Sequence, residues 1–274
     1  MTTPRTSRPR ALVTGASSGI GRVFAQRLAR DGSDLVLVAR RQERLVEIAS
    51  QIEKDGAKVE IIVADLGKPD DLAVVERRAA VGDLSMLVNN AGFQIYMPFV
   101  EVDADRAEAQ IFVHTTAVVR LSRAALPAMV AKGSGSIINL SSMLAFSAGV
   151  DLPYLPRRAT YAATKAFVNA FTETLATELK GTGVKVQALC PGVVRTEFHD
   201  RDGKPAAIRP NVPIMEPEDV VEASLAGLAL GDVICVPALP DRSMLDHERE
   251  ARHALFGPGL GGRLSPRYAV KQTT

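Results

Sequence analysis

The sequence predicts a doubly wound α/β fold, in which a parallel sheet of seven strands carries helices on both faces of a single domain. Short runs rich in Val, Ile and Leu alternate with longer stretches of helical period, as expected for strands buried on both faces. A glycine-rich turn joins the first such run to a helical stretch. A chain of 274 residues, 46% of them hydrophobic, fits one large core better than two small ones.

The elements follow one another in a regular order. The expected strands are Ala11–Thr14, Leu35–Ala39, Val59–Ala64, Met86–Asn89, Ser136–Leu140, Val184–Leu189 and Val233–Pro237. The expected helical stretches are Ile20–Asp31, Gln42–Asp55, Pro69–Ala80, Val102–Val113, Val118–Lys132, Thr160–Lys180 and Glu218–Leu230. Right-handed crossovers between such units give an open sheet.

Prolines and glycines interrupt this rhythm in the segments 143–158 and 196–217, which we expect to be loops beside a binding site. We expect residues 1–9 to be a flexible N-terminus and residues 10–240 to form the main domain. Residues 241–274 should form a C-terminal helix, within Asp241–Phe256, and an irregular tail.

Charge and composition exclude several classes of partner. A net charge of +2, with acids and bases interspersed, does not favour a nucleic-acid or membrane surface. Because no run approaches the ~18 to 20 apolar residues that cross a bilayer, we expect a cytoplasmic protein. Cys190 and Cys235 each end an apolar run and are expected to be small buried residues, not a disulfide or metal ligands.

The glycine turn is the first candidate binding site. Gly15, Gly19 and Gly21 leave no Cβ atoms to keep a pyrophosphate from the backbone N–H groups, and the following helix adds its positive dipole end. An ordinary glycine-rich loop is the alternative. The order of strand, turn and helix favours a dinucleotide.

The second strand indicates which dinucleotide. In NAD-binding sites of this kind, an acidic residue at the end of the second strand binds the ribose 2′-hydroxyl. This sequence has Ala39 at that place, followed by Arg40 and Arg41. Asp34 lies at the opposite end of the strand. A guanidinium suits a 2′-phosphate, so we predict NADP(H) with Arg40 as its main contact. A solvated helix start is the alternative interpretation of both arginines.

A tyrosine and a lysine form the candidate catalytic pair. Tyr161 and Lys165 lie four residues apart at the start of a helical stretch and so share one face. A nearby ammonium favours the phenolate and is expected to lower the tyrosine pKa from ~10, which suits proton transfer. Ser142 follows the fifth strand, at the sheet edge that faces the ligand crevice, and can hydrogen-bond the reacting oxygen.

Together with Asp65, the Asn89-Asn90-Ala91-Gly92 stretch and the Pro191–Thr196 segment, these motifs resemble the short-chain dehydrogenase/reductase family from Ala11 to Pro237. The resemblance implies a Rossmann fold and an oxidoreductase with Tyr161 as general acid/base, Ser142 as orienter of the substrate oxygen, and Lys165 on the nicotinamide ribose. It also implies contact of Asp65 with the adenine. The cofactor-binding residues expected in all are Gly15, Ser17, Ser18, Gly19, Ile20, Gly21, Arg40, Asp65, Leu66, Asn89, Ala91, Gly92, Tyr161, Lys165, Pro191, Gly192, Val194 and Thr196.

Two features depart from the family pattern. Where many members have an asparagine that supports a proton relay, this chain has His114, which is either a catalytic residue or a packing histidine. The segment between Ser142 and Tyr161 is longer than the family pattern suggests. The crevice is expected to be apolar, with these residues near it: Phe93, Ile95, Tyr96, Met97, Met143, Leu144 and Phe198.

The sequence thus predicts an NADP(H)-dependent oxidoreductase that moves a hydride between the nicotinamide and a carbonyl or secondary alcohol, with a hydrophobic ketone as substrate and no metal. Two alternatives are a non-catalytic NADP(H)-binding sensor or scaffold, and an epimerase or dehydratase that uses the cofactor cyclically. By analogy with the family, a homodimer or homotetramer is expected.

Overall fold

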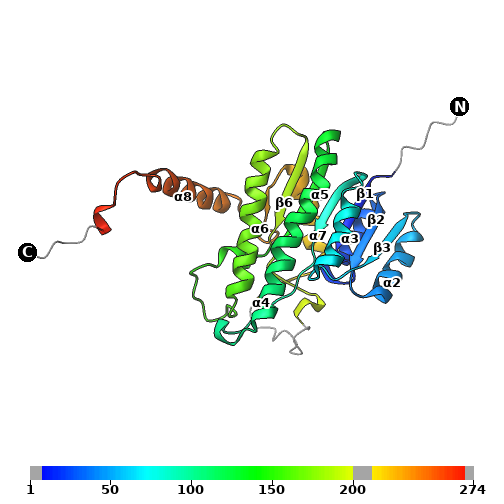
Figure 1. The fold of residues 1–274 in the computed structure, drawn as a ribbon, viewed down its shortest axis with the longest axis horizontal. Helices are drawn as coiled ribbons and strands as arrows, with labels where there is room; N and C mark the ends of the chain where they lie inside the picture. Colours follow the sequence, from blue (N-terminus) through cyan, green and yellow to red (C-terminus); the bar gives the residue numbers. More distant parts are fainter. Residues whose placement is uncertain (1–7, 200–211, 269–274) are drawn as a thin grey trace, which may run out of the picture. The chain divides into compact units, whose positions relative to one another are not determined.

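A computed structural model describes residues 8–199 and 212–268 of the chain (Figure 1). Two compact units, Met1–Pro237 and Ala238–Thr274, are considered separately. The expected flexible N-terminus at 1–9 and the expected loop at 196–217 lie in part outside the described residues.

The first unit is built on a parallel seven-stranded sheet with the order β3-β2-β1-β4-β5-β6-β9. Its strands are β1 (Arg10–Thr14), β2 (Asp34–Ala39), β3 (Val59–Val63), β4 (Leu84–Asn89), β5 (Gly135–Leu140), β6 (Val184–Leu189) and β9 (Ile234–Cys235). In register, Leu12 of β1 lies between Val36 of β2 and Leu87 of β4. The chain winds outward from β1 to β3, returns to β4 and winds outward on the other side, so the predicted doubly wound fold is confirmed. Ligands bind such sheets where the winding reverses, here between β1 and β4.

Helices cover both faces of this sheet (Figure 1). The helices are α1 (Gly19–Arg30), α2 (Gln42–Glu53), α3 (Pro69–Ala79), α4 (Ala104–Ile111), α5 (Ala117–Lys132), α6 (Ala159–Glu178) and α7 (Pro217–Leu230). One core cluster joins α1, α2 and α7 to the sheet through side chains such as Leu28, Leu45 and Val220. The other joins α3 and α5 through Leu72 and Leu121. Burial of both faces explains why the central strands β1 and β2 contain continuous apolar runs.

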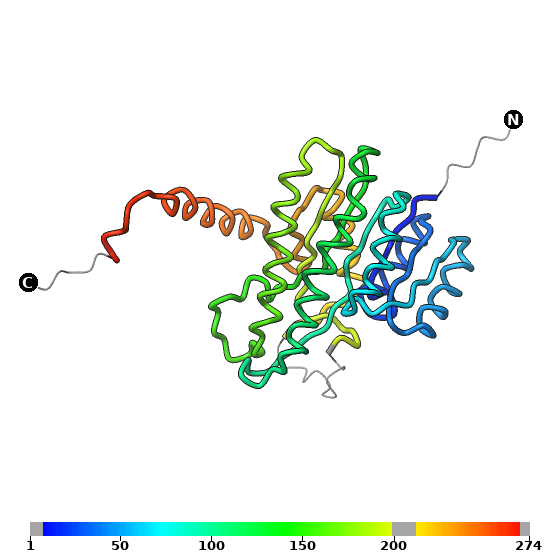
Figure 2. Tube along the Cα trace, viewed as in Figure 1, coloured from blue at the N-terminus to red at the C-terminus, as the bar shows by residue number. Residues whose placement is uncertain are grey.

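The structure corrects one expectation about the helices. Residues 104–132 were expected to form two helical stretches with a break near 114–117, but they form one helical run in which the π-helical turn η2 (Phe112–Thr116) joins α4 to α5 (Figure 2). A π turn adds a residue and rotates the apolar face, so the two halves have different phases in the sequence. His114 lies in this turn.

Short elements follow the fifth and sixth strands. The segment 143–158 begins with the 3₁₀ turn η3 (Met143–Phe146). The chain after β6 forms β7 (Val193–Val194), which pairs in parallel with β8 (Ile214–Met215). Between them, η4 (Glu197–His199) brings the start of the 196–217 segment toward the glycine turn.

The second unit contains α8 (Ser243–Gly259), a helix with no buried residue. It overlaps the helix expected within Asp241–Phe256. Across the described ranges, no helix combines the length and the apolar character needed to span a membrane.

Candidate functional site

The glycine turn between β1 and α1 is held tightly against the end of β4. Gly15 has φ +66°, and a Cβ on it would lie 2.7 Å from the Asn90 amide nitrogen. That amide donates to the carbonyl oxygen of Thr14 at 2.9 Å and to that of Gly15 at 3.3 Å. A Cβ on Gly21 would lie 2.3 Å from the same amide. The turn therefore requires glycine at both positions.

The N-terminus of α1 fits an anionic ligand. Ser18 is its N-cap but makes no capping hydrogen bond, and the first turn has no acidic side chain. The first N–H groups of a helix have no partner within the helix, and its dipole favours negative charge there. The residues present thus fit the pyrophosphate of a dinucleotide.

The two arginines after β2 have different partners. Arg41 donates to the hydroxyl oxygens of Ser17 and Ser18, at 3.2 and 2.8 Å. Arg40 is more exposed and forms an ion pair with Asp65 at 3.6 Å. Arg40 is the main phosphate contact predicted from the sequence, whereas in the structure Arg41 lies on the glycine turn.

The other predicted cofactor residues lie around the same edge of the sheet, and several act on the protein itself. The Asn89 amide is buried and donates to the Asn139 side chain at 2.9 Å and to the Ser122 hydroxyl at 3.2 Å. The Ala91 N–H donates to the Thr14 hydroxyl at 3.0 Å. Leu66 and Val194 are buried, and Pro191 and Gly192 lead from β6 into β7. Thr196 lies beside the glycine turn, 3.0 Å from where a Gly19 Cβ would be.

The predicted catalytic side chains come together where η3 meets α6. Tyr161 and Lys165 lie in the first two turns of α6, both about 5% exposed. The Lys165 ammonium lies 5.6 Å from the centre of the Tyr161 ring and donates to the Leu140 carbonyl at 2.7 Å. Ser142 hydrogen-bonds to Tyr161, and its hydroxyl oxygen also accepts from the Leu144 N–H. Because this hydrogen bond lowers the pKa of Tyr161, the serine O–H is the donor and the phenol oxygen the acceptor.

Burial controls the ionisation of this group. It raises the pKa of Tyr161 above its usual value, and the hydrogen bond from Ser142 only partly offsets this. Burial also lowers the pKa of Lys165 to about 8. The expected lowering of the tyrosine pKa by the ammonium is thus not found in the protein alone, where burial is the largest influence on Tyr161 and raises its pKa. The protein's own groups hold Tyr161 as a neutral phenol, which is the form that donates a proton.

His114 is fixed in one tautomer. Its Nε2 accepts a hydrogen bond from the Phe93 N–H at 3.1 Å, so the ring proton of the neutral form is on Nδ1. Nδ1 lies 3.0 Å from the Thr164 hydroxyl oxygen, and that hydroxyl donates to the Tyr161 carbonyl at 2.8 Å. Burial and the neighbouring Lys165 hold the pKa of His114 well below 6.5. The imidazole is therefore a neutral link between the Phe93 backbone and α6.

Aromatic rings surround the phenol. Tyr96 meets the Tyr161 ring edge-on with 5.5 Å between ring centres, and His114 does so at the same distance. The ring centre of Phe198 lies 6.3 Å from that of Tyr161. Tyr96 is itself buried, and burial raises its pKa. Two predicted members of the apolar crevice, Tyr96 and Phe198, thus gather at the tyrosine, and a third, Phe93, lies beside His114 with 6.0 Å between ring centres.

Some contributors had no clear sequence signal. Thr164 lies between Tyr161 and Lys165 in the chain, so its position in the motif could have suggested a role. Gln110 donates to the Phe93 carbonyl at 3.0 Å, but a glutamine in a helix indicates nothing by itself. Glu197 forms ion pairs with Arg41 and Arg44, which are far from it in sequence. In the described part of the chain, no cluster of three or more His, Cys, Asp or Glu side chains could hold a metal, and both cysteines are free and buried.

Known proteins are similar to this chain in sequence and in architecture. A family model for short chain dehydrogenases matches residues 9–206. Sulfoacetaldehyde reductase 2 of Chromohalobacter salexigens is 37% identical over 223 residues, covering 77% of this chain and 84% of that protein. The very-long-chain 3-oxoacyl-CoA reductase of Anas platyrhynchos is 34% identical over 226 residues, covering 80% of this chain and 69% of that protein.

Two solved structures are similar over nearly the whole chain. A short-chain dehydrogenase from Sphingobium yanoikuyae, in complex with NADPH, has a TM-score of 0.88 and 37% identity, covering 95% of this chain and all of that chain. The bulky-bulky ketone specific alcohol dehydrogenase from Comamonas testosteroni has a TM-score of 0.86 and 31% identity, covering 97% of this chain and all of that chain. From the family match and these relatives, the chain belongs to the short-chain dehydrogenase/reductase family.

Proposed function

We propose that this protein is an NADP(H)-dependent carbonyl reductase or alcohol dehydrogenase that acts on hydrophobic ketones and their secondary alcohols. The observation that carries the proposal is the arrangement of Tyr161. Its neutral phenol is hydrogen-bonded to Ser142 and lies within one helical turn of the Lys165 ammonium. All three residues lie next to the sheet edge that carries the glycine turn.

The protein's own residues supply the proton chemistry. The Ser142 hydroxyl orients the substrate oxygen, and the Tyr161 phenol donates its proton to that oxygen during reduction. Lys165 favours the phenolate that is left, because its charge is close and little screened in this buried site. NADPH, when bound, supplies the hydride. In alcohol oxidation the phenolate accepts the proton.

His114 has a positioning role in this proposal. It accepts from the Phe93 N–H, while Gln110 donates to the Phe93 carbonyl, so the run α4–η2 holds the Phe93 backbone on both sides. Through Thr164, the same imidazole is linked to the backbone of Tyr161. The histidine thus fixes the loop after β4 relative to α6, and a buried neutral ring does not carry the proton.

The preference for NADP(H) is supported by two arginines and no acid at the end of β2. Arg41 on the glycine turn is our main candidate for the 2′-phosphate, with Arg40 beside Asp65 as a second cation. The Sphingobium yanoikuyae relative was solved in complex with NADPH. The first turn of α1 would hold the pyrophosphate, and Thr196 and Lys165 would lie on the nicotinamide side.

Aromatic residues support a hydrophobic substrate. Tyr96 and Phe198 flank the Tyr161 ring, and both belong to segments that border the crevice. The Comamonas testosteroni relative is described as specific for bulky-bulky ketones. We therefore propose ketones with two large apolar substituents as the first substrates to test.

A cytoplasmic location and a homodimer or homotetramer also belong to this proposal.

A substrate panel tests the proposal. The purified protein is incubated with NADPH and aryl or long-chain ketones, and reduced nicotinamide is followed by its absorbance. Oxidation that depends on the ketone, with one alcohol formed per NADPH consumed, is the expected result. Binding of NADPH without turnover of any ketone supports a sensor instead. Conversion of a substrate without net loss of NADPH supports the epimerase or dehydratase alternative.

A further inference from the structure

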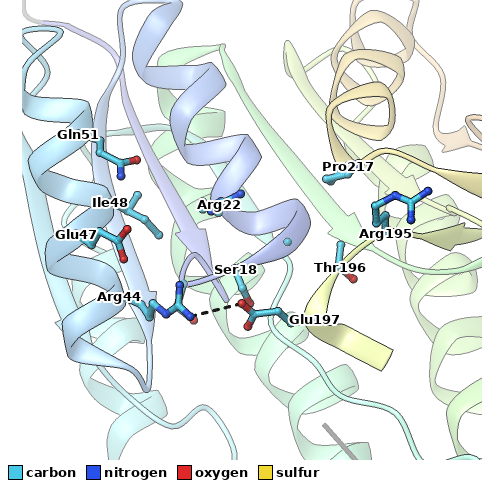
Figure 3. Close-up of a pocket in the computed structure, with 12 residues that line it drawn as sticks. Ser18, Arg22, Arg44, Glu47, Ile48, Gln51, Arg195, Thr196, Glu197 and Pro217 are labelled. Carbon is cyan, nitrogen blue, oxygen red and sulfur yellow. Dashed lines mark ion pairs between the residues drawn. The ribbon is translucent and has the colours of Figure 1, made fainter. Parts of the chain in front are cut away.

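One carboxylate lies between two arginines beside the glycine turn, Arg41 and Arg44. Glu197, in η4, accepts from Arg41 at 2.9 Å through one oxygen and lies 3.7 Å from Arg44 through the other. Figure 3 shows the ion pair between Glu197 and Arg44 beside Ser18, at the edge of the pocket. The side chains of Arg41, Glu197 and Arg44 are 37%, 43% and 49% exposed.

A carboxylate bridging two guanidiniums marks a place where the protein stabilises an anion. The Ser17 and Ser18 hydroxyls also contact Arg41, so polar groups surround this place on the side of the turn. A phosphate has the same charge sign and suits the same planar donors. An anionic ligand at this position must therefore displace Glu197 or share the arginines with it.

We infer that Glu197 competes with the 2′-phosphate of NADP(H) for Arg41 and Arg44 and so sets the affinity and selectivity for this cofactor. The inference rests on the proposed function, because it needs NADP(H) to bind at the glycine turn. Glu197 lowers the affinity for a ligand with a 2′-phosphate. A ligand with a 2′-hydroxyl does not compete with Glu197 for the two guanidiniums, so Glu197 leaves the affinity for that ligand unchanged.

The surrounding space permits this exchange. A pocket of about 310 Å³ lies next to the ion pair, between α1, α2 and the chain after β7. Glu197, Arg44, Ser17 and Thr196 all line it, so the carboxylate can turn into open space when a ligand takes its place. Glu197 belongs to the short turn η4, where a rotamer change leaves the sheet untouched.

Binding of adenosine 2′,5′-bisphosphate and of 5′-AMP, by isothermal titration calorimetry, tests the inference without turnover. The variant is Glu197→Gln, which removes the charge and keeps the shape. The control is Glu60→Gln, which makes the same change in a residue that pairs with Arg78, and neither Glu60 nor Arg78 lines this pocket. We expect Glu197→Gln to bind the bisphosphate roughly two- to fivefold more tightly, the range for a partly exposed ion pair. Its affinity for 5′-AMP and both affinities of Glu60→Gln should stay within the error of wild type.

Salt and a second variant complete the test. The gain in Glu197→Gln should shrink as sodium chloride is raised to about 0.5 M, because the pair is exposed to screening. An unchanged bisphosphate affinity, or an equal gain for 5′-AMP, overturns the inference. Arg41→Ala distinguishes this failure from failure of the cofactor assignment. If Arg41→Ala weakens bisphosphate binding but Glu197→Gln has no effect, the competition by Glu197 is refuted and the cofactor assignment stands. If Arg41→Ala has no effect either, both the competition and the assignment of Arg41 to the 2′-phosphate are refuted.

Discussion

Replacing Lys165 by methionine should change how the stability of the protein depends on pH. Lys165 is about 5% exposed, and burial lowers its pKa from 10.5 to about 8. Each pKa unit corresponds to ~1.4 kcal/mol, so the folded state holds the ammonium at a cost of about 3 kcal/mol relative to the unfolded chain. The Lys165→Met variant is free of this cost at every pH.

The sign follows from the two pKa values. The folded pKa lies below the unfolded one, so the unfolded chain binds more protons between about pH 8 and 10.5. The cost is fully present below pH 8 and disappears as the pH rises toward 10.5. From about pH 7.5 to 9.5, wild type should gain about 2 kcal/mol relative to Lys165→Met. The lost hydrogen bond to Leu140 adds a separate term at both pH values.

Urea unfolding followed by far-ultraviolet circular dichroism measures this difference, since the chain has no tryptophan to report by fluorescence. Lys185→Met is the matched control, because Lys185 is exposed on β6 and also donates to a backbone carbonyl, that of Leu228. Its difference from wild type should not change over the interval. The stability difference between Lys165→Met and wild type should change with pH. If it is as independent of pH as the difference for the control, Lys165 is not a buried ammonium, and the proposed proton chemistry loses its basis.

Four further outcomes are expected. Tyr161→Phe should lower kcat about 10²- to 10⁴-fold and leave the Kd for NADPH within about twofold, because it removes only the proton donor; equal losses in both would contradict the assigned acid. Arg41→Ala should raise the KM for NADPH more than Arg40→Ala, since Arg41 lies on the glycine turn, and Arg40→Asp should move preference toward NADH; the reverse ranking restores Arg40 as the main contact. His114→Phe should lower the free energy of unfolding by about 1–3 kcal/mol, because the buried Phe93 N–H loses its acceptor. His114→Asn should lose less, and equal losses of the two variants in urea unfolding would show that the hydrogen bond is not the reason. Gly15→Ala should cost about 1–2 kcal/mol in the same assay, because alanine is strained at φ +66° and its Cβ meets the Asn90 amide, and an unchanged midpoint would contradict the tight turn.

The sheet could be predicted from the sequence because strands that are buried on both faces appear as apolar runs. The position of the glycine turn and the shared face of Tyr161 and Lys165 could be predicted for a similar reason, since both are local patterns. The break expected between α4 and α5 was wrong because a π turn leaves the helix continuous while changing its phase.

Properties that depend on the fold were not available from local patterns. Arg40 and Arg41 are adjacent in sequence, and only the tertiary structure separates the ion pair with Asp65 from the bonds to the glycine turn. The tautomer of His114 depends on the Phe93 N–H, 21 residues away. The raised pKa of Tyr161 depends on burial, which the spacing of Tyr161 and Lys165 cannot report.

Hydride transfer and the role of Tyr161 as proton donor are tested together by a single-turnover experiment with a bulky aryl ketone and NADPH deuterated at the transferred position of the nicotinamide. The proposal predicts that wild type forms alcohol carrying one deuterium at the former carbonyl carbon, and that Tyr161→Phe binds the same cofactor but forms this product at least about a hundredfold more slowly. Labelled alcohol formed at the same rate by the variant, or ketone left unreduced by wild type across the panel, would contradict it.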